Sequence, residues 1–353
     1  MFLSGAVLCA AVLLGCGLAP AAEPDALTVA PKEFVLRGQT ARQRLIVTGT
    51  VGGRPVDLTR KATFRSDAPT VARVGSDGLV TPAGDGTATI TATAHGRTVA
   101  ATVKVIDGTR LLDVTFERDV IPVLTRAGCN AGSCHGKARG QNGFALSLLS
   151  YDADFDYNAI VNEARGRRVF PGSPENSLLL RKPAAQVSHG GGKRLDAASP
   201  GYDVLRRWIA AGTPRTPKDA PVVVRISVEP PERILAAGGA QQLAVTAHYS
   251  DGSSADVTQL ASFQSNESAI AAVTPDGLIK AGPIPGEAAI MARFLEKFAV
   301  VGITIPLAGD VPAEVYAKLP RHNFIDGLVW DKLWRLGITP SGPAGDATFL
   351  RRA

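Results

Sequence analysis

Two stretches of the chain repeat the same residues at a fixed spacing, and this repeat constrains the fold more than any other feature. The first runs from Asp57 to Ser66 and reads DLTRKATFRS, and the second runs from Asp256 to Ser265 and reads DVTQLASFQS. They lie 199 residues apart, and the same spacing relates the Asp-Gly-Leu steps at 77–79 and 276–278. A repeat of this kind indicates two copies of one structural unit, separated by a segment of different character.

Both copies have the pattern of short strands. Residues 87–94 alternate small and β-branched side chains, which is typical of a half-buried strand, and the Asp-Gly steps mark turns. We therefore expect two small β-sandwiches, over residues 26–106 and 223–305. The Asp-x-Thr step, the aromatic residue before Ser and the Asp-Gly-Leu turn resemble the bacterial Ig-like domain of group 2. That resemblance implies a spacer, adhesion or accessory module rather than a particular activity.

The first residues of the chain have the character of an export signal. Residues 2–22 are apolar and uncharged, and they end in small residues. We expect a signal peptide over residues 1–21, with cleavage, lipidation at Cys16 or a retained anchor as the three alternatives. Each alternative places the rest of the chain outside the cytoplasm, in the periplasm or at the cell surface. A lipid on Cys16 is the expected form of any lasting contact with a membrane.

The run from Gly128 to Gly136 carries the residues with the most specific chemistry. The chain has four cysteines, and two of them, Cys129 and Cys134, lie in this run with His135 directly after. Two cysteines followed by histidine are typical of haem c attachment, in which both thiols form thioethers and the histidine binds the iron. The spacer here has four residues where two are usual, and Gly132 offers the backbone freedom for a longer loop.

The surrounding segment, residues 110–218, is basic and has helical patterns at both ends. It holds 16 Lys or Arg against 10 Asp or Glu, and this excess of six equals the net charge of the whole chain. Apolar spacing predicts helices over 116–124 and 202–212. The charge is consistent with an acidic redox partner or with an ordinary solvated surface. Because no basic stripe is interleaved with aromatic residues, we expect no binding of nucleic acid.

Several runs of this segment resemble the planctomycete-type cytochrome c domain. They are FERDVIPVL at 116–124, Cys134-His135-Gly136, FPGSPENSL at 170–178 and LRRWIAAG at 205–212. The resemblance implies one covalent haem c on Cys129 and Cys134, with His135 as the proximal iron ligand. Many such domains place methionine on the distal side, but both methionines of this chain lie elsewhere. His189 is therefore the candidate distal ligand, and a plain loop histidine is the alternative.

Other interpretations of the same residues remain open. In an exported protein Cys129 and Cys134 can form a disulfide. A zinc site lacks enough nearby ligands. A hydrolase nucleophile elbow around Cys134 lacks both the order of motifs and the alternating strands and helices of that fold.

The last residues, 312–353, change character again. Apolar residues at helical spacing predict a helix over 323–334, and Trp330 and Trp334 are expected in a core. The run resembles the opening of the second planctomycete cytochrome-associated domain, so we expect the start of a truncated helical domain.

Taken together, these patterns predict a multidomain protein with two all-β Ig-like sandwiches flanking a small, mainly α cytochrome c-like domain, plus a helical C-terminal fragment. The expected function is electron transfer or redox sensing through an exported haem c, with no catalysis assigned to this chain. The alternative is a non-redox cell-surface adhesion or scaffold protein with a Cys129–Cys134 disulfide. The partner would be an acidic redox protein or a cell-surface or periplasmic assembly.

Overall fold

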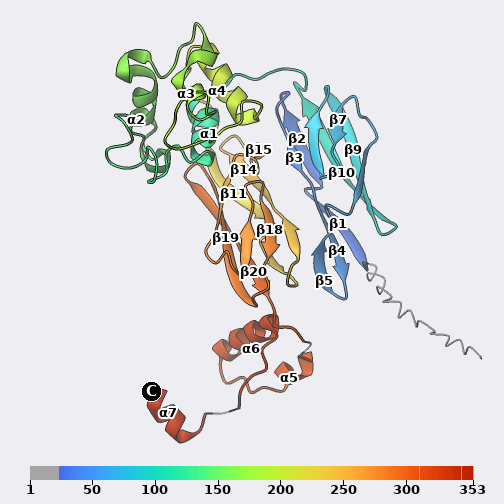
Figure 1. The fold of residues 1–353 in the computed structure, drawn as a ribbon. Coiled ribbons are helices and arrows are strands. Elements are labelled where there is room, and N and C mark those ends of the chain that lie inside the picture. The colour runs from blue at the N-terminus through green and yellow to red at the C-terminus, as the bar shows by residue number, and fades with distance from the viewer. Residues whose placement is uncertain (1–23, 310, 343, 353) are drawn as a thin grey trace, which may run out of the picture.

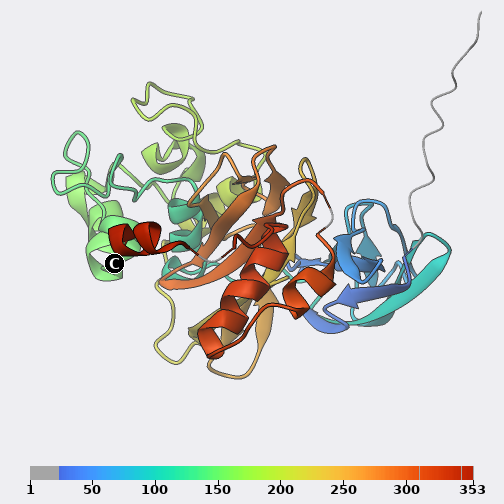
Figure 2. The ribbon, with the colours of Figure 1, turned by 90° about the horizontal axis from the view of Figure 1, so that it is seen from below.

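The computed structural model describes residues 24–309, 311–342 and 344–352. The predicted signal peptide, with Cys16, lies outside the described residues. Figure 1 shows two β-sandwiches side by side, with the segment between them in sequence lying at one end of the second sandwich and helices α5 and α6 at the opposite end. The view from below in Figure 2 shows the same neighbouring sandwiches.

The first sandwich contains ten strands in three small sheets. The sheet orders are β1-β4-β5, β2-β10-β9-β6 and β3-β8-β7, and only the pairing of β2 with β10 is parallel. The strands are β1 Ala26–Ala30, β2 Glu33–Arg37, β3 Gln43–Arg44, β4 Ile46–Val51, β5 Arg54–Asp57, β6 Thr63–Ser66, β7 Ala72–Val74, β8 Leu79–Pro82, β9 Gly86–Ala94 and β10 Arg97–Ile106.

The second sandwich repeats this topology strand for strand. Its sheet orders are β11-β14-β15, β12-β20-β19-β16 and β13-β18-β17, and the pairing of β12 with β20 is the parallel one. The strands are β11 Val223–Glu229, β12 Glu232–Ile234, β13 Ala240–Gln242, β14 Ala244–Tyr249, β15 Ser254–Asp256, β16 Ser262–Ser265, β17 Ala271–Val273, β18 Leu278–Ala281, β19 Gly286–Phe294 and β20 Lys297–Ile305.

Alternation along the strands explains the two cores. In β9 every second residue from Ala88 to Ala94 is buried, as expected where one face of a strand meets the opposing sheet. Equivalent positions are fully buried in both sandwiches, including Val80 with Ile279 and Val103 with Ile303. The repeat seen in the sequence is therefore a repeat of buried positions, and it fixes the same fold twice.

The segment between the sandwiches is poor in helix and rich in turns. Its elements are a π-helical turn at Phe116–Val120, α1 Ile121–Arg126, a 3₁₀ turn at Leu148–Ser150, α2 Ala153–Tyr157, a π-helical turn at Asn158–Asn162, 3₁₀ turns at Glu163–Gly166 and Pro174–Asn176, α3 Leu178–Arg181 and α4 Pro200–Ala210. Its core is built around Trp208, whose ring lies 5.4 Å from that of Phe116. The Trp208 Nε1–H donates to Pro214 O at 3.0 Å.

The predicted fold class is wrong for this segment. The chain folds mainly as two β-sandwich halves, and no mainly α cytochrome c-like domain lies between them. The helical elements from Phe116 to Arg181 have three to six residues each. Helix α4, which follows them, has 11 residues. Glycine recurs every three or four residues from Gly128 to Gly143, and glycine disfavours helix propagation. The patterns at 116–124 and 202–212 do form helix, but only at the two ends of the segment.

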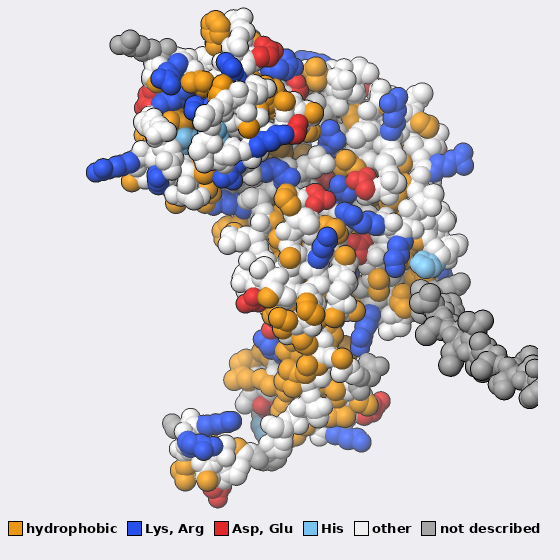
Figure 3. All heavy atoms as spheres, viewed as in Figure 1, with side chains coloured by type: hydrophobic (Ala, Val, Ile, Leu, Met, Phe, Trp, Pro, Cys, Tyr) orange, Lys and Arg blue, Asp and Glu red, His pale blue; other side chains and the backbone are white. Residues whose placement is uncertain are grey.

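Three helices follow the second sandwich: α5 Ala313–Ala317, α6 Phe324–Leu336 and α7 Asp346–Arg352. Helix α6 begins with a capping box between Asn323 and Asp326 and ends at Gly337, which has a φ of 66°. Figure 3 shows hydrophobic side chains gathered over this region, and the Trp334 side chain is 49% exposed, so its expected place in a core is wrong. In the described part of the chain, no helix has the length and apolar character needed to cross a membrane.

Candidate functional site

The residues with the most specific chemistry lie in the loop that follows α1. Helix α1 ends in a Schellman motif, in which Gly128 has a φ of 73° and the Cys129 N–H donates to Leu124 O at 2.9 Å. The loop then turns back on itself, because the His135 N–H donates to Cys129 O at 3.0 Å. The structure therefore brings Cys129, Cys134 and His135 into one compact turn, as their closeness in sequence requires.

Asn130 holds this turn together, and sequence reasoning did not single it out. Its side chain is fully buried, and its Nδ2 donates to Thr125 Oγ1 and to Ser150 Oγ, both at 2.8 Å. Its backbone oxygen accepts from the Leu149 N–H at 3.0 Å. The signal in the sequence was weak, because a single asparagine in a loop has no distinctive spacing. Asn130 links the end of α1 to the turn at 148–150.

Gly136, and not Gly132, is the glycine that the turn requires. A Cβ on Gly136 would lie 2.0 Å from Asn130 O, far inside the contact distance of any real side chain. A Cβ on Gly132 would meet only Leu148 Cδ1 at 3.7 Å, an ordinary contact. The expectation that Gly132 gives the loop its freedom therefore has no support in the packing. The close approach of two backbone segments occurs at Gly136.

His135 is half-buried and fixed by a backbone carbonyl. Its Nδ1 lies 2.8 Å from Phe144 O, so a proton on Nδ1 is donated to that oxygen, and its ring centroid lies 4.5 Å from that of Phe144. Burial lowers the pKa of His135 below its ordinary value, although the bond to Phe144 opposes this. The nearby positive charges of His189, Arg168 and Lys182 lower the pKa further. The neutral ring is therefore the form that this site favours.

The two cysteines are free thiols. Burial raises the pKa of the Cys129 thiol to about 11, and the charge of Cys134 adds to the rise, while Arg194 opposes it. The Arg194 guanidinium lies close to the pair, with Nη2 3.9 Å from Cys134 Sγ. A thiol with so high a pKa stays protonated near neutral pH, so Cys129 is a weak nucleophile and a weak metal ligand.

His189 lies on a loop that the structure brings near His135. Its Nδ1 is 2.8 Å from Gly192 O, a contact within its own loop. The two histidines are close enough that the charge of His189 lowers the pKa of His135. The contacts of His189 are those of a loop histidine.

The expectation of a haem c protein is wrong, and with it the expected iron binding and electron transfer. Across the described ranges, no group of three or more His, Cys, Asp or Glu side chains is placed to hold a metal ion. The segment was expected to be a mainly helical domain around the cofactor. Apart from α4, its helices are only one or two turns long. Cys129 is partly buried and packs against the apolar core of the segment.

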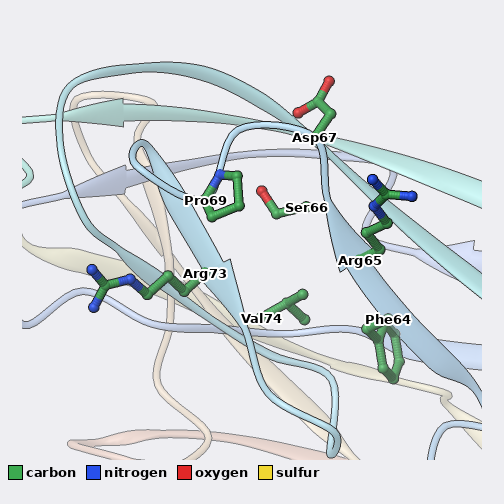
Figure 4. A pocket seen from close by; sticks show the side chains of 7 residues that line it. All are labelled: Phe64, Arg65, Ser66, Asp67, Pro69, Arg73 and Val74. Atoms are coloured by element: carbon green, nitrogen blue, oxygen red, sulfur yellow. The ribbon is translucent and has the colours of Figure 1, made fainter.

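Two hollows on the described surface lie on the sandwiches. One is lined by residues between Phe64 and Val74, and Figure 4 shows Asp67 and Arg73 directed away from each other there, so no charged groups converge on it. The other lies where Arg126 meets the second sandwich near Phe263, and the Arg126 Nη1–H donates to Ala261 O at 2.9 Å. Neither hollow is lined by Cys129, Cys134 or His135.

Comparison with known proteins gives one family match. Residues 60–105 match the bacterial Ig-like domain family, and no cytochrome c family accompanies this match. The matched stretch covers much less than half of the chain. No sequence among the curated proteins matches.

Solved structures with a partial likeness come from surface proteins. Domains 1–6 of the surface layer protein SbsC have 15% identity and a TM-score of 0.22, over 82% of this chain and 29% of that one. Domains 5–6 of SbsC have 11% identity and a TM-score of 0.32, over 80% of this chain and 99% of that one. An intimin mutant of EHEC O157:H7 has 20% identity and a TM-score of 0.18, over 29% of this chain and 58% of that one. At these scores the likeness supports no conclusion about fold or function. This chain spans about 29% of the length of the first of these structures.

Proposed function

We propose that the protein is an exported, non-redox scaffold or adhesion protein of the cell surface. The observation that carries this proposal is the repeated β-sandwich, since both copies have the same strand order and residues 60–105 match the bacterial Ig-like domain. The apolar N-terminal residues support export. In this proposal the sandwiches form the framework, and the segment of residues 110–218 is the part that meets a partner.

The charge of that segment supports an acidic partner. Its excess of positive side chains is visible in Figure 3, where Lys and Arg gather over the segment at the end of the second sandwich. Exposed aromatic rings accompany the charges, with Tyr151 94% and Phe170 54% exposed. Positive charge attracts an acidic surface over about 10 Å at moderate salt, and the rings supply apolar contact area.

Export from the cytoplasm also affects the oxidation state of Cys129 and Cys134. Outside the cytoplasm a disulfide-bearing oxidant can take two electrons from Cys129 and Cys134, whose thiols lose two protons as the S–S bond forms. The two thiols lie in one turn, where the charge of Cys134 helps to raise the pKa of Cys129. The proposed disulfide closes this turn and stabilises it, by roughly 2 kcal/mol for so short a loop.

Intact mass distinguishes the proposed protein from a redox carrier. The chain is exported from a host that has the machinery for haem attachment, and it is then denatured without reductant and weighed. We expect the mass of the processed polypeptide less two hydrogens, and the Cys134→Ser variant should lack that loss. A larger mass that survives denaturation, together with peroxidase stain in the gel, would overturn the proposal.

Binding to cells tests the surface role. The Lys137→Glu, Arg139→Glu variant reverses two exposed charges in the proposed contact segment. The matched control, Arg97→Glu with Lys104→Glu, reverses two exposed charges on the first sandwich. We expect the first variant to lose binding to intact producing cells, most clearly at low salt, and the control to keep it. Equal binding by both variants, or no binding by the unaltered protein, would count against the role.

A further inference from the structure

The two sandwiches touch through equivalent faces. Strand β5 of the first contacts β12 and β13 of the second, and the equivalent strand β15 of the second contacts β2 and β3 of the first. Both ribbon views show the sandwiches side by side rather than end to end. In an interface related by two-fold symmetry, residue i meets j and the equivalent of j meets the equivalent of i. Here that relation holds between two repeats of one chain.

The register of the strands establishes which residues are equivalent. Arg44 of β3 pairs with Leu79, and Gln242 of β13 pairs with Leu278, at matching positions of the two repeats. The aspartates that end β5 and β15 match as well. The Asp57 Oδ1 accepts from the Thr59 N–H at 2.8 Å, and the Asp256 Oδ1 accepts from the Thr258 N–H at 2.7 Å.

Each aspartate uses its second oxygen to reach the other sandwich. The Gln242 N–H donates to Asp57 Oδ2 at 2.6 Å, and the Arg44 N–H donates to Asp256 Oδ2 at 2.5 Å. A glutamine amide adds a longer bond in each case. The Gln241 Nε2 lies 3.3 Å from Asp57 Oδ2, and the Gln43 Nε2 lies 3.4 Å from Asp256 Oδ2.

The residues of this contact are polar and yet buried. Gln241 and Gln242 have no exposed area, and Gln43 and Arg44 are 5% and 4% exposed. Strands β3 and β13 are edge strands, whose outward N–H groups need partners when the edge is covered. The aspartate of the opposite repeat supplies that partner. The sandwiches therefore meet through matched hydrogen-bonding groups on each side.

We propose that Asp57 and Asp256 form a reciprocal lock that holds the two Ig-like repeats side by side as one rigid body. The repeats are then a folded-back pair and not a flexible spacer. Arg126 ties the intervening segment to the second sandwich through Ala261 O, so the lock also fixes the direction in which that segment faces. The proposal depends only on the contacts between the repeats and holds whatever the protein binds.

The Asp57→Asn, Asp256→Asn double variant tests the lock with little change of shape. Each asparagine keeps an oxygen for its own threonine N–H, but it places an NH₂ group against the N–H groups of the other repeat. Asp67→Asn is the matched control, because Asp67 Oδ1 accepts from the Thr89 N–H within its own repeat at 2.7 Å. The second repeat already has Asn266 in that role, accepting from the Ala289 N–H at 2.7 Å.

The measurement is small-angle X-ray scattering of the full chain, with circular dichroism to verify that the sandwiches stay folded. We expect the unaltered protein and Asp67→Asn to scatter as the structure does. The double variant should have a larger radius of gyration and a longer maximum dimension at unchanged dichroism.

Several results would overturn the lock. One is a double variant that is folded and as compact as the unaltered protein. Another is an unaltered protein that already scatters as an extended chain. A third is an unaltered protein whose mass by light scattering is that of two chains exchanging repeats. If the double variant loses its β dichroism, each single variant is measured in the same way, and equal compactness of both would also refute the proposal.

Discussion

Replacing Gly136 with alanine should destabilise the turn that holds Cys129, Cys134 and His135. The new Cβ would lie 2.0 Å from Asn130 O, 2.7 Å from Asn130 C and 2.9 Å from Ala131 O. All three atoms belong to backbone, which cannot rotate away as a flexible side chain does. The turn must therefore open by more than 1 Å.

The size of the effect follows from what the opening breaks. The Gly136 N–H donates to Ala131 O and the His135 N–H donates to Cys129 O, both at 3.0 Å. Each such bond contributes on the order of 1 kcal/mol, and overpacking adds about 1–3 kcal/mol. We expect Gly136→Ala to lower the free energy of unfolding of this segment by roughly 2–4 kcal/mol. Gly132→Ala, in the same loop, should change it by less than about 0.5 kcal/mol.

Urea unfolding followed by the fluorescence of Trp208 measures this difference. Trp330 and Trp334 are first replaced by phenylalanine in every variant, so that the remaining tryptophan reports the segment between the sandwiches. Because the chain has several folded parts, the transition of this segment is fitted separately from that of the sandwiches. Equal midpoints for Gly136→Ala and Gly132→Ala would refute the reasoning, since the two variants add the same atom to the same loop.

Three further predictions concern single side chains. Trp208→Phe should lower the unfolding free energy of the segment by about 2 kcal/mol, because it leaves a gap and removes the Nε1 bond to Pro214 O. The same urea titration, followed by circular dichroism, measures the change, and an unchanged midpoint would contradict the prediction. The pKa of His135 is lowered in the folded protein, so the unfolded chain binds the proton more tightly and stability should fall as the pH drops below about 6.5; His135→Asn keeps a donor near Phe144 O and should lose that part of the pH dependence in thermal melts. Asn323→Ala removes the cap of α6 and should reduce helix content there at a cost of about 1 kcal/mol, whereas Asn323→Asp should retain it, as measured by hydrogen exchange.

The sandwiches could be predicted because their signals are local. Alternation in 87–94, the Asp-Gly turns and the spacing of 199 residues depend on strands that bury every second side chain. The segment between them could not be predicted in the same way. Two amphipathic patterns at its ends do form helix, but the residues from Gly128 to Gly143 form turns whose paths depend on contacts with Asn130 and Phe144. The resemblance to the planctomycete-type cytochrome c domain predicted a haem c for that segment, but the geometry of the segment does not support a bound haem.

The candidate site illustrates the same limit. The sequence placed Cys129, Cys134 and His135 together because they are neighbours in the chain. The protonation states of Cys129 and His135 could not be predicted from the sequence. They depend on burial and, for His135, on the carbonyl of Phe144, and the spacing of residues in the sequence shows neither. His189 lies 54 residues beyond His135 in the sequence, and only the folded chain brings its charge close enough to act on that ring.

The sequence by itself determined that this protein contains two copies of one small β-sandwich, since the repeat and the alternation along strands such as β9 depend on local residues. The sequence also contains Asp57 and Asp256 as the first residue of each Asp-x-Thr step. The bond from one carboxylate oxygen to the threonine N–H lies within that step, so it depends only on neighbouring residues. The tertiary structure decided where the second oxygen goes. It reaches a backbone N–H of the opposite repeat, because the partly buried carboxylate lies against an edge strand whose outward N–H groups need acceptors.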